Sequence, residues 1–356
     1  MEKYHVLVAG QKRGLWPGIQ RAGLWLASVP YGWAAGWRNR LYESGWKQTY
    51  RAPVPVVSVG NLTVGGTGKT PCVEYVARLY RQQDVRVAIL SRGNASSRGR
   101  NDEAMVLEES LPDVPHLQGI DRVALARTAV EELESEILVL DDGFQHRRLH
   151  RDLDIVLIDA SNPWGHGFLF PRGLLREPSA SLRRAGAIVL TRCDQVRPEA
   201  RSETRQTIAR LAPAVPVVEA MHQPVELCNS EQAKASLELL RIRPVAAFCG
   251  IGNPGAFRDT LLSLDAELCD FRLFPDHHPY SRSDIEDLRS WANKQARDCL
   301  IVTTQKDMVK LRLSLLGGRP LWALRISMEL GAGRDMLDGK LIAALNSGSR
   351  GKIISA

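Results

Sequence analysis

The stretch that decides the fold is Val56-Val-Ser-Val-Gly60-Asn-Leu-Thr-Val-Gly65-Gly-Thr-Gly-Lys69-Thr70. A run of β-branched residues leads into a glycine-rich turn, and Gly-Lys-Thr then opens a helical stretch. Glycines let backbone N–H groups converge on phosphate oxygens, and a helix N-terminus adds partial positive charge there. The pattern predicts a phosphate-binding loop in which Lys69 reaches the β- and γ-phosphates and Thr70 ligates Mg²⁺.

The loop departs from the strict pattern G-x-x-x-x-G-K-T, because Thr63 stands where a glycine is expected. Its core, Gly-Gly-x-Gly-Lys-Thr, instead resembles the loops of ParA/MinD-like P-loop proteins. That class often carries a second lysine where this chain has Val64. We expect the nucleotide to be held by Thr63, Val64, Gly65, Gly66, Thr67, Gly68, Lys69 and Thr70.

Downstream of the loop, short apolar runs alternate with helical stretches. Runs of this kind without polar alternation suit a parallel sheet covered on both faces. The order predicts a P-loop NTPase-type, doubly wound, mostly parallel α/β sheet, followed by a second, smaller α/β domain. Expected strands are 54–59, 85–90, 137–140, 155–158, 187–191 and 215–218, then 245–249, 268–273 and 300–303; expected helices are 69–83, 122–133 and 198–211, then 254–264, 283–295 and 306–315.

A second motif is the acidic sequence Asp141-Asp142-Gly143, which follows the apolar run Ile137–Leu140. A buried strand that delivers carboxylates to the carboxyl edge of the sheet is how a P-loop protein holds its Mg²⁺. We expect both Asp141 and Asp142 at the metal, and leave open which one touches it.

The N-terminal segment, residues 1–50, differs from the rest of the chain. The 356 residues carry a net charge of +7, and residues 1–51 hold eight Lys/Arg against two acids, together with five of the eight Trp. The uncharged run Ala22–Trp37 has helical spacing, is too short to span a bilayer and is interrupted by Pro30. We expect a membrane-associating, interfacial helix or helical hairpin, with a helix packed on the domain as the alternative.

The composition excludes a disordered tail protein, a collagen-like fibre and a polytopic membrane protein. Apolar residues make up 44% and charged residues 24%, which is ordinary for a globular protein. The six Cys form no C-x-x-C pair, which argues against a zinc ribbon or a disulfide scaffold. The expected domains are a P-loop core at 51–220, a linker at 221–243, the smaller domain at 244–346 and a tail at 347–356.

Five blocks together resemble the tetraacyldisaccharide 4′-kinase family of lipid A biosynthesis. They are Arg51 to Pro71, Ser91-Arg-Gly93, Asp141-Asp-Gly-Phe-Gln-His146, Leu174-Leu-Arg-Glu-Pro178 and Asp276-His277, and the resemblance covers nearly the whole chain. It implies transfer of the γ-phosphate of ATP, with Mg²⁺, to the 4′-hydroxyl of tetraacyldisaccharide 1-phosphate. It also implies two α/β domains with the active site between them, at the cytoplasmic face of the inner membrane.

The resemblance also implies residue roles. Asp102 matches the aspartate that helps deprotonate the hydroxyl, and His277 matches the histidine that cooperates with it; Lys69 and Asp142 complete the expected catalytic set. Arg92, Glu103, His146, Arg176 and Glu177 are expected at the substrate. Two departures weaken the assignment of Asp102: Asn94-Ala95 replaces Tyr-Gly, and Ala104 replaces proline.

Two other functions compete with this one. A membrane-docked ParA/MinD-like nucleotide switch would need neither the second domain nor Asp276-His277. A kinase or ligase acting on another small hydroxyl or amine would not need the Trp-rich start. We expect an acylated disaccharide phospholipid and an anionic membrane surface as partners, with no nucleic acid and no obligatory protein partner.

Overall fold

The computed structural model describes residues 2–93 and 102–349, and the chain divides into two compact units. Unit 1 comprises residues 1–98, 110–222 and 328–356, and unit 2 comprises residues 99–109 and 223–327. We describe each unit separately.

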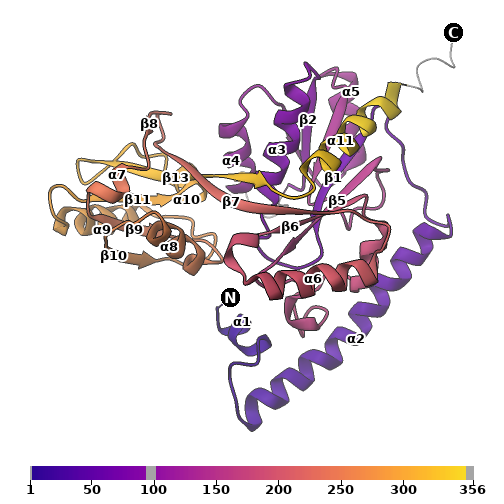
Figure 1. Cartoon of the computed structure of the whole chain (residues 1–356), viewed down its shortest axis with the longest axis horizontal. Coiled ribbons are helices and arrows are strands. Elements are labelled where there is room, and N and C mark those ends of the chain that lie inside the picture. Colours follow the sequence, from indigo (N-terminus) through magenta and orange to yellow (C-terminus); the bar gives the residue numbers. More distant parts are fainter. Residues whose placement is uncertain (1, 94–101, 350–356) are drawn as a thin grey trace. The chain divides into compact units, whose positions relative to one another are not determined.

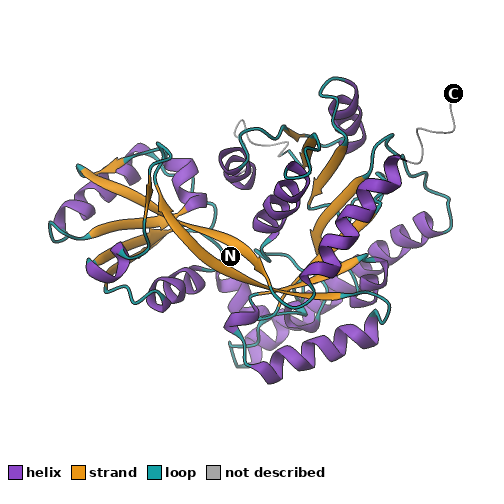
Figure 2. Ribbon diagram, turned by 45° about the horizontal axis from the view of Figure 1, so that its top comes forward, coloured by secondary structure: helices purple, strands orange, loops and turns teal. Residues whose placement is uncertain are grey.

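The core of unit 1 is a parallel sheet in the order β7-β6-β5-β1-β4-β2-β3 (Figures 1 and 2). Residues of the central strands are almost all buried, because helices cover the sheet. The strands are β1 Val56–Asn61, β2 Val87–Ser91, β3 His116–Gln118, β4 Ile137–Asp141, β5 Leu153–Asp159, β6 Ala187–Thr191 and β7 Val217–Cys228, which continues into unit 2. The helices are α3 Lys69–Arg81, α5 Arg122–Glu131, α6 Pro198–Leu211 and α11 Arg334–Ser349, with short 3₁₀ turns at Gly165–Gly167, Ser179–Arg184 and Cys193–Gln195.

Two further helices of unit 1 form the N-terminal segment, α1 Glu2–Val8 and α2 Leu15–Glu43. The helix α2 is continuous through Pro30, so the segment is a long helix rather than a hairpin. It packs on the loop that precedes Pro178: the Tyr31 hydroxyl donates to the Arg176 carbonyl (3.0 Å) and its ring meets Phe170 edge-on. No helix within residues 2–93 and 102–349 is long and apolar enough to cross a membrane.

Unit 2 is a smaller α/β layer with the strand order β10-β9-β11-β13-β7. Phe248 lies at its centre, where the rings of Phe274, Tyr280 and Trp291 meet it edge-on. The strands are β8 Lys234–Ala235, β9 Val245–Cys249, β10 Leu268–Leu273, β11 Leu300–Thr304, β12 Leu315–Leu316 and β13 Arg319–Leu330; the helices are α4 Asp102–Ser110, α7 Leu239–Ile242, α8 Pro254–Ser263, α9 Arg282–Lys294 and α10 Gln305–Leu311.

The division into units differs from the expected domain ranges at two places. The expected linker 221–243 holds the second half of β7, and the chain after Met328 packs on unit 1 instead of the smaller domain. The contacts of α11 explain the second difference, since Tyr75 donates to Asp338 (2.6 Å) and buried Tyr80 to the Leu341 carbonyl (2.8 Å). Likewise α4, early in the sequence, belongs to unit 2. Sequence periodicity carries no information about such long-range packing.

Candidate functional site

The phosphate-binding loop of unit 1 follows β1 and ends where α3 begins at Lys69. Gly65 and Gly68 have φ values of +124° and +89°, which side chains rarely tolerate. A Cβ atom at Gly68 would also lie 2.5 Å from Nε2 of His222, so glycine is required there twice over. Burial, aided by Arg192, lowers the pKa of His222 to about 4, so this ring is neutral against the loop.

The carbonyl groups of this loop are held by the protein. Asn61 donates to the Gly65 carbonyl (3.3 Å), Arg192 to that of Gly66 (2.8 Å) and the Thr191 hydroxyl to that of Thr67 (3.0 Å). Asn61 also donates to the Thr67 hydroxyl (3.0 Å). In the described part of the chain, no backbone carbonyl accepts from the N–H groups of residues 65–68. Those N–H groups are therefore available to an anion, which fits a bound phosphate.

Thr63 and Val64, the first two residues of the expected nucleotide loop, are held by the segment that contains Leu174 and Leu175. The Val64 N–H donates to the Leu174 carbonyl (2.7 Å), and Thr63 pairs with Leu175 as an isolated antiparallel bridge. The loop that follows cis-Pro171 thus supports the phosphate loop directly. Thr63, where the strict pattern has glycine, is buried.

The strand β4 places the two acidic residues beside α3. Asp142 has φ +51°, and its carboxylate meets the Arg176 guanidinium (2.8 Å to both oxygens) and the Lys69 ammonium (3.6 Å). Burial raises the pKa of Asp142, but Lys69 and Arg176 outweigh burial and hold it below its ordinary value. Asp142 is therefore ionised at neutral pH. A carboxylate, an ammonium and a guanidinium converge at the mouth of the phosphate loop.

Asp141 lies deeper. Its carbonyl accepts from Arg122 (3.2 Å), and its charge adds to the burial that raises the pKa of Cys72 on α3 to about 12. Its carboxylate is therefore close to the first turn of α3, which begins at Lys69 and Thr70. Among the described residues, no group of three or more His, Cys, Asp or Glu could hold a metal ion alone. This suits Mg²⁺, which usually takes one or two carboxylates and completes its shell with phosphates and water.

The turn after Asp142 carries Gln145 and His146. Gln145 donates to the Asn61 carbonyl (3.0 Å) and accepts from Arg176 (3.3 Å), which ties the acidic turn to β1. Burial, with Arg122 and two further arginines, lowers the pKa of His146 to about 4. His146 is thus a neutral ring, and its buried Nε2 has no hydrogen-bond partner within residues 2–93 and 102–349.

Glu177, expected at the substrate, lies inside unit 1 in this structure. Its side chain is fully buried, and its oxygens accept from Arg38 (3.2 Å), Asn39 (2.8 Å) and Arg184 (2.8 Å). Its role at the substrate therefore stays a prediction. In this structure Glu177 holds α2 on the loop that carries Arg176. Arg92, by contrast, is exposed at the end of β2, and Asn94 and Ala95 lie outside the described residues.

Unit 2 brings Asp102 and His277 together although 175 positions separate them. Nδ1 of His277 lies 3.0 Å from Oδ2 of Asp102, and Nε2 lies 3.8 Å from Asp276. The hydrogen bond to Asp102 raises the pKa of His277. Burial raises the pKa of Asp102, but its bond to His277 and the charge of Lys310 outweigh burial and lower it. Glu103 pairs with Lys306 (2.8 Å).

Comparisons with known proteins show the family of this chain. The sequence model of the Tetraacyldisaccharide-1-P 4′-kinase family matches residues 20–346. The chain belongs to this family. A tetraacyldisaccharide 4′-kinase of Anaeromyxobacter sp. (strain K) is 44% identical over 345 residues, 91% of this chain and 90% of the relative. One of Syntrophus aciditrophicus (strain SB) is 42% identical over 299 residues, 77% of this chain and 80% of the relative.

A solved structure is similar throughout. The crystal structure of LpxK from Aquifex aeolicus in complex with ATP superposes with a TM-score of 0.74 at 32% identity, covering 92% of this chain and 99% of that one. The resemblance deduced from the sequence and the α/β fold class are thereby confirmed. The chain is a kinase, and its family acts on a lipid disaccharide.

Several residues that contact the candidate site were not expected from the sequence. Asn61 and Arg122 appear as a strand end and a helix start, and nothing in a single sequence distinguishes them. Arg192 lies in Thr191-Arg-Cys-Asp, after a strand of the nucleotide-binding sheet, and that position was a usable indication. Its guanidinium pairs with Asp159 as well as with the loop. Lys310 has no motif at all.

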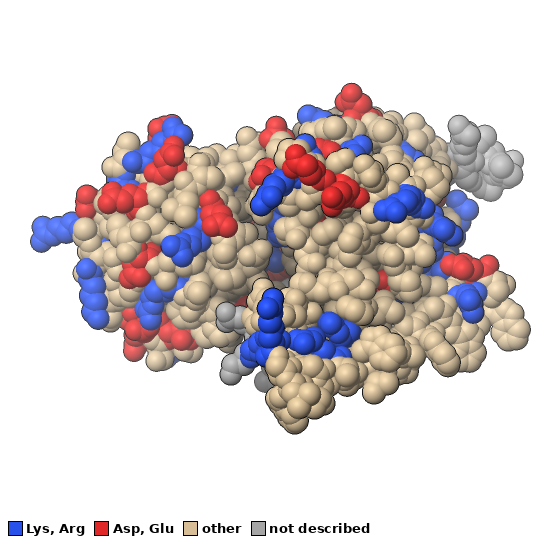
Figure 3. Space-filling model, turned by 60° about the horizontal axis from the view of Figure 1, so that its bottom comes forward, with Lys and Arg blue, Asp and Glu red and all other residues tan. Residues whose placement is uncertain are grey.

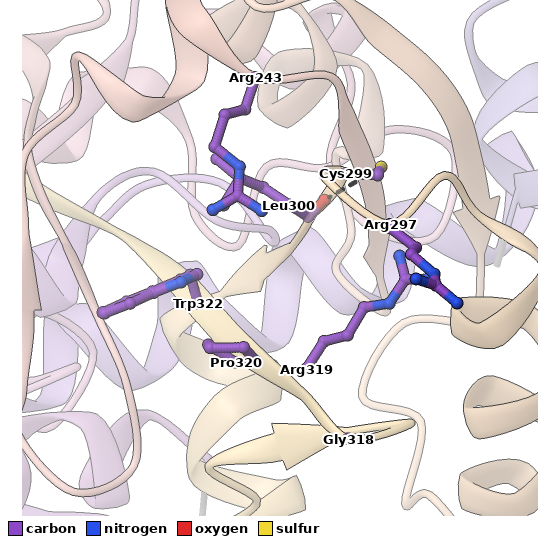
Figure 4. A pocket seen from close by; sticks show the side chains of 8 residues that line it. All are labelled: Arg243, Arg297, Cys299, Leu300, Gly318, Arg319, Pro320 and Trp322. Carbon is purple, nitrogen blue, oxygen red and sulfur yellow. Dashed lines mark hydrogen bonds between the residues drawn. The ribbon is translucent and has the colours of Figure 1, made fainter.

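A pocket in unit 2 lies apart from the kinase site. It has a volume of about 120 Å³, and Arg243, Arg297, Arg319 and Trp322 line it where β11 and β13 begin (Figure 4). His277 follows the opposite, carboxyl end of this parallel sheet. Arg243 and Arg319 donate to backbone carbonyls of residues 295–298, so these guanidinium groups cap the turn after α9.

Proposed function

We propose that this chain transfers the γ-phosphate of ATP to the 4′-hydroxyl of tetraacyldisaccharide 1-phosphate, using the residues described above. The observation that carries the proposal is the ionised carboxylate of Asp142, held by Lys69 and Arg176 at a loop whose N–H groups are available to phosphate. A glycine-rich turn that binds no ligand would not explain why two cations converge on this carboxylate.

The nucleotide is held by unit 1. The N–H groups of the loop and the Lys69 ammonium bind its phosphates, which concentrate negative charge. The Thr70 hydroxyl and the Asp141 carboxylate are the protein ligands of Mg²⁺, and Asp142 keeps Lys69 and Arg176 in place. When bound, Mg²⁺ neutralises charge on the transferred phosphoryl group.

The acceptor hydroxyl is activated by unit 2. As the 4′-oxygen bonds to the γ-phosphorus and the bond to the ADP oxygen breaks, the hydroxyl proton passes to Asp102, with His277 beside it to share the charge. The 3.0 Å contact between the two supports this role, because it holds both groups in hydrogen-bonding geometry.

The helix α2 is proposed to lie on the cytoplasmic surface of the inner membrane. Trp16, Trp25, Trp33 and Trp37 expose half to four fifths of their surface, and basic residues accompany them. Figure 3 shows Lys and Arg beside uncharged surface on the face that includes α2. Tryptophan favours the headgroup zone and Lys/Arg favour anionic lipid, so this helix would bring the kinase to a lipid substrate.

The first test is transfer from γ-labelled ATP·Mg²⁺ to tetraacyldisaccharide 1-phosphate in mixed micelles, with Lys69→Ala and the surface control Lys294→Ala. We expect a labelled bis-phosphorylated lipid with the wild type and the control, and none with Lys69→Ala. ATP hydrolysis without lipid labelling would contradict the proposed acceptor.

Membrane docking is tested by sedimentation with vesicles of phosphatidylethanolamine and phosphatidylglycerol. The double change Trp33→Ala/Trp37→Ala removes apolar surface from α2, while Ile242→Ala removes a similarly exposed apolar side chain from unit 2. We expect the double variant to move to the supernatant and the control to pellet as the wild type does. Equal pelleting of both would refute docking through α2.

A further inference from the structure

Lys310 occupies an unusual place in unit 2. Its side chain is about nine-tenths buried, on α10, and its ammonium lies 3.0 Å from Asp307 and 3.5 Å from Asp102. It also stands over the ring of Tyr280, 5.2 Å from the centroid. Burying an ammonium is costly unless carboxylates accompany it, so a lysine at this depth calls for an explanation.

Asp307 explains how Lys310 is held in place. Asp307 is fully buried, and its Oδ2 accepts from the Thr304 hydroxyl (2.7 Å) and the Gly250 N–H (3.0 Å). Its Oδ1 faces Lys310. Asp307 is therefore a fixed anchor that takes no part in chemistry, and it directs the ammonium toward Asp102.

The two cations that reach Asp102 meet the same oxygen. Nδ1 of His277 and Nζ of Lys310 both approach Oδ2, at 3.0 and 3.5 Å. Within the described residues, the hydrogen bond to the Asp102 carboxylate goes to Oδ2, and none goes to Oδ1. One oxygen is thus hydrogen-bonded to His277 and lies beside the Lys310 ammonium, and the other is left to accept a proton.

We propose that Lys310 is a positioning residue of the proton-accepting pair. It holds Oδ2 of Asp102 together with His277, so that Oδ1 faces the acceptor hydroxyl as an ionised carboxylate oxygen. This inference rests on the proposed roles of Asp102 and His277. Lys310 does not touch the substrate; it acts through Asp102.

The other charged groups around the pair are already engaged. On α4, Glu103 pairs with Lys306 of α10, and on the loop after β10, Asp276 lies 3.8 Å from His277. Tyr280 stays neutral, because burial and Asp307 raise its pKa far above its ordinary value. A substitution of Lys310 therefore removes one cation from Asp102, while Glu103, Lys306 and Asp276 keep their partners.

The test is a pH profile of kcat and KM for Lys310→Met and Lys310→Arg in the full chain. Lys310 is among the causes that lower the pKa of Asp102, so its loss raises that pKa. Because catalysis needs Asp102 in its basic form, the enzyme then loses activity at a higher pH. The acidic limb of the kcat/KM profile therefore shifts to higher pH. We expect a fall in kcat of about 10- to 100-fold, since general base catalysis as a whole contributes about 10²–10⁴-fold. KM for ATP should be unchanged, and Lys310→Arg should restore the limb.

A purely structural role is separated by two further variants. Lys310→Met/Asp307→Asn removes both members of the buried pair, which is usually better tolerated than removing one, and it should show the same shifted limb. In an Asp102→Asn background, Lys310→Met should cost nothing more in kcat, because it acts through Asp102.

Three outcomes decide the matter. An unshifted limb with kcat within twofold of the wild type would overturn the role of Lys310 and leave the proposed function intact. An undiminished further loss in the Asp102→Asn background would also overturn it. Full activity in both Asp102→Asn and His277→Ala would instead refute the proposed pair itself.

Discussion

Asp142 in unit 1 and Asp102 in unit 2 are both carboxylates beside cations, yet they are built differently. Asp142 meets the ammonium of Lys69 and the guanidinium of Arg176. Asp102 meets the imidazole of His277, whose pKa this hydrogen bond raises, and the buried ammonium of Lys310. The first arrangement suits holding phosphate charge, and the second suits moving a proton. The difference shows that the partner of a carboxylate, more than its own burial, indicates which task it serves.

Removing the cation of unit 1 should have the largest effect. Lys69→Ala deletes the ammonium at the phosphate loop, and kcat should fall by at least about 10²–10³-fold, the loss typical of one preorganised charge-stabilising donor. Lys69→Arg keeps the charge but not its geometry, and it should remain impaired. Steady-state transfer from labelled ATP measures both variants. Wild-type rates in Lys69→Ala would contradict the assignment of the Asp142 cluster to phosphate binding.

Altering the pair of unit 2 should reduce kcat by about 10²-fold or more, within the range of general base catalysis. We expect Asp102→Asn and His277→Ala to keep the wild-type KM for ATP, because the nucleotide is held by unit 1. The split between kcat and KM is the measurement that matters. A rise in KM for ATP with unchanged kcat would assign these residues to nucleotide binding instead.

Glu177 is a third carboxylate beside cations, and we expect its contacts to stabilise the fold. Glu177→Gln weakens the buried contacts to Arg38 and Arg184 and should lower the free energy of unfolding by about 1–3 kcal/mol. Glu43→Gln, at the end of α2, alters a pair with Arg147 in which the glutamate is exposed, and it should cost less than about 1 kcal/mol. Urea denaturation compares the two. Unchanged stability in Glu177→Gln, or a loss of kcat per folded molecule, would contradict the structural role.

The smallest effect concerns His146, whose pKa in the folded chain is about 4. The unfolded chain takes up this proton near pH 6.5, so the folded state binds fewer protons between pH 6.5 and 4, and stability falls as the pH drops through that window. Allowing for partial exposure, the loss is about 1–2 kcal/mol. Denaturation at pH 7 and pH 4.5 should show a smaller difference in His146→Gln than in the wild type or in His150→Gln. An equal difference in all three would contradict a buried, neutral His146.

Local patterns predicted elements of both units. The helix α6 and the strands β6, β9 and β10 begin and end where the sequence predicts, and α3 begins at the predicted Lys69. Apolar runs and glycine turns are local, so periodicity finds them. The strand β13 and the helix α4 were not predicted, since each depends on partners far along the chain.

The sequence by itself determined the phosphate loop, the acidic strand end, the basic Trp-rich start and the family to which they belong. These features depend on residue types at short, fixed spacings, where backbone geometry leaves few alternatives. Only the tertiary structure decided that Glu177 is an internal anchor, that α11 packs on unit 1, and that Lys310 and His277 share one oxygen of Asp102. Such contacts join residues separated by up to 263 positions, and their geometry arises from packing that no local pattern encodes.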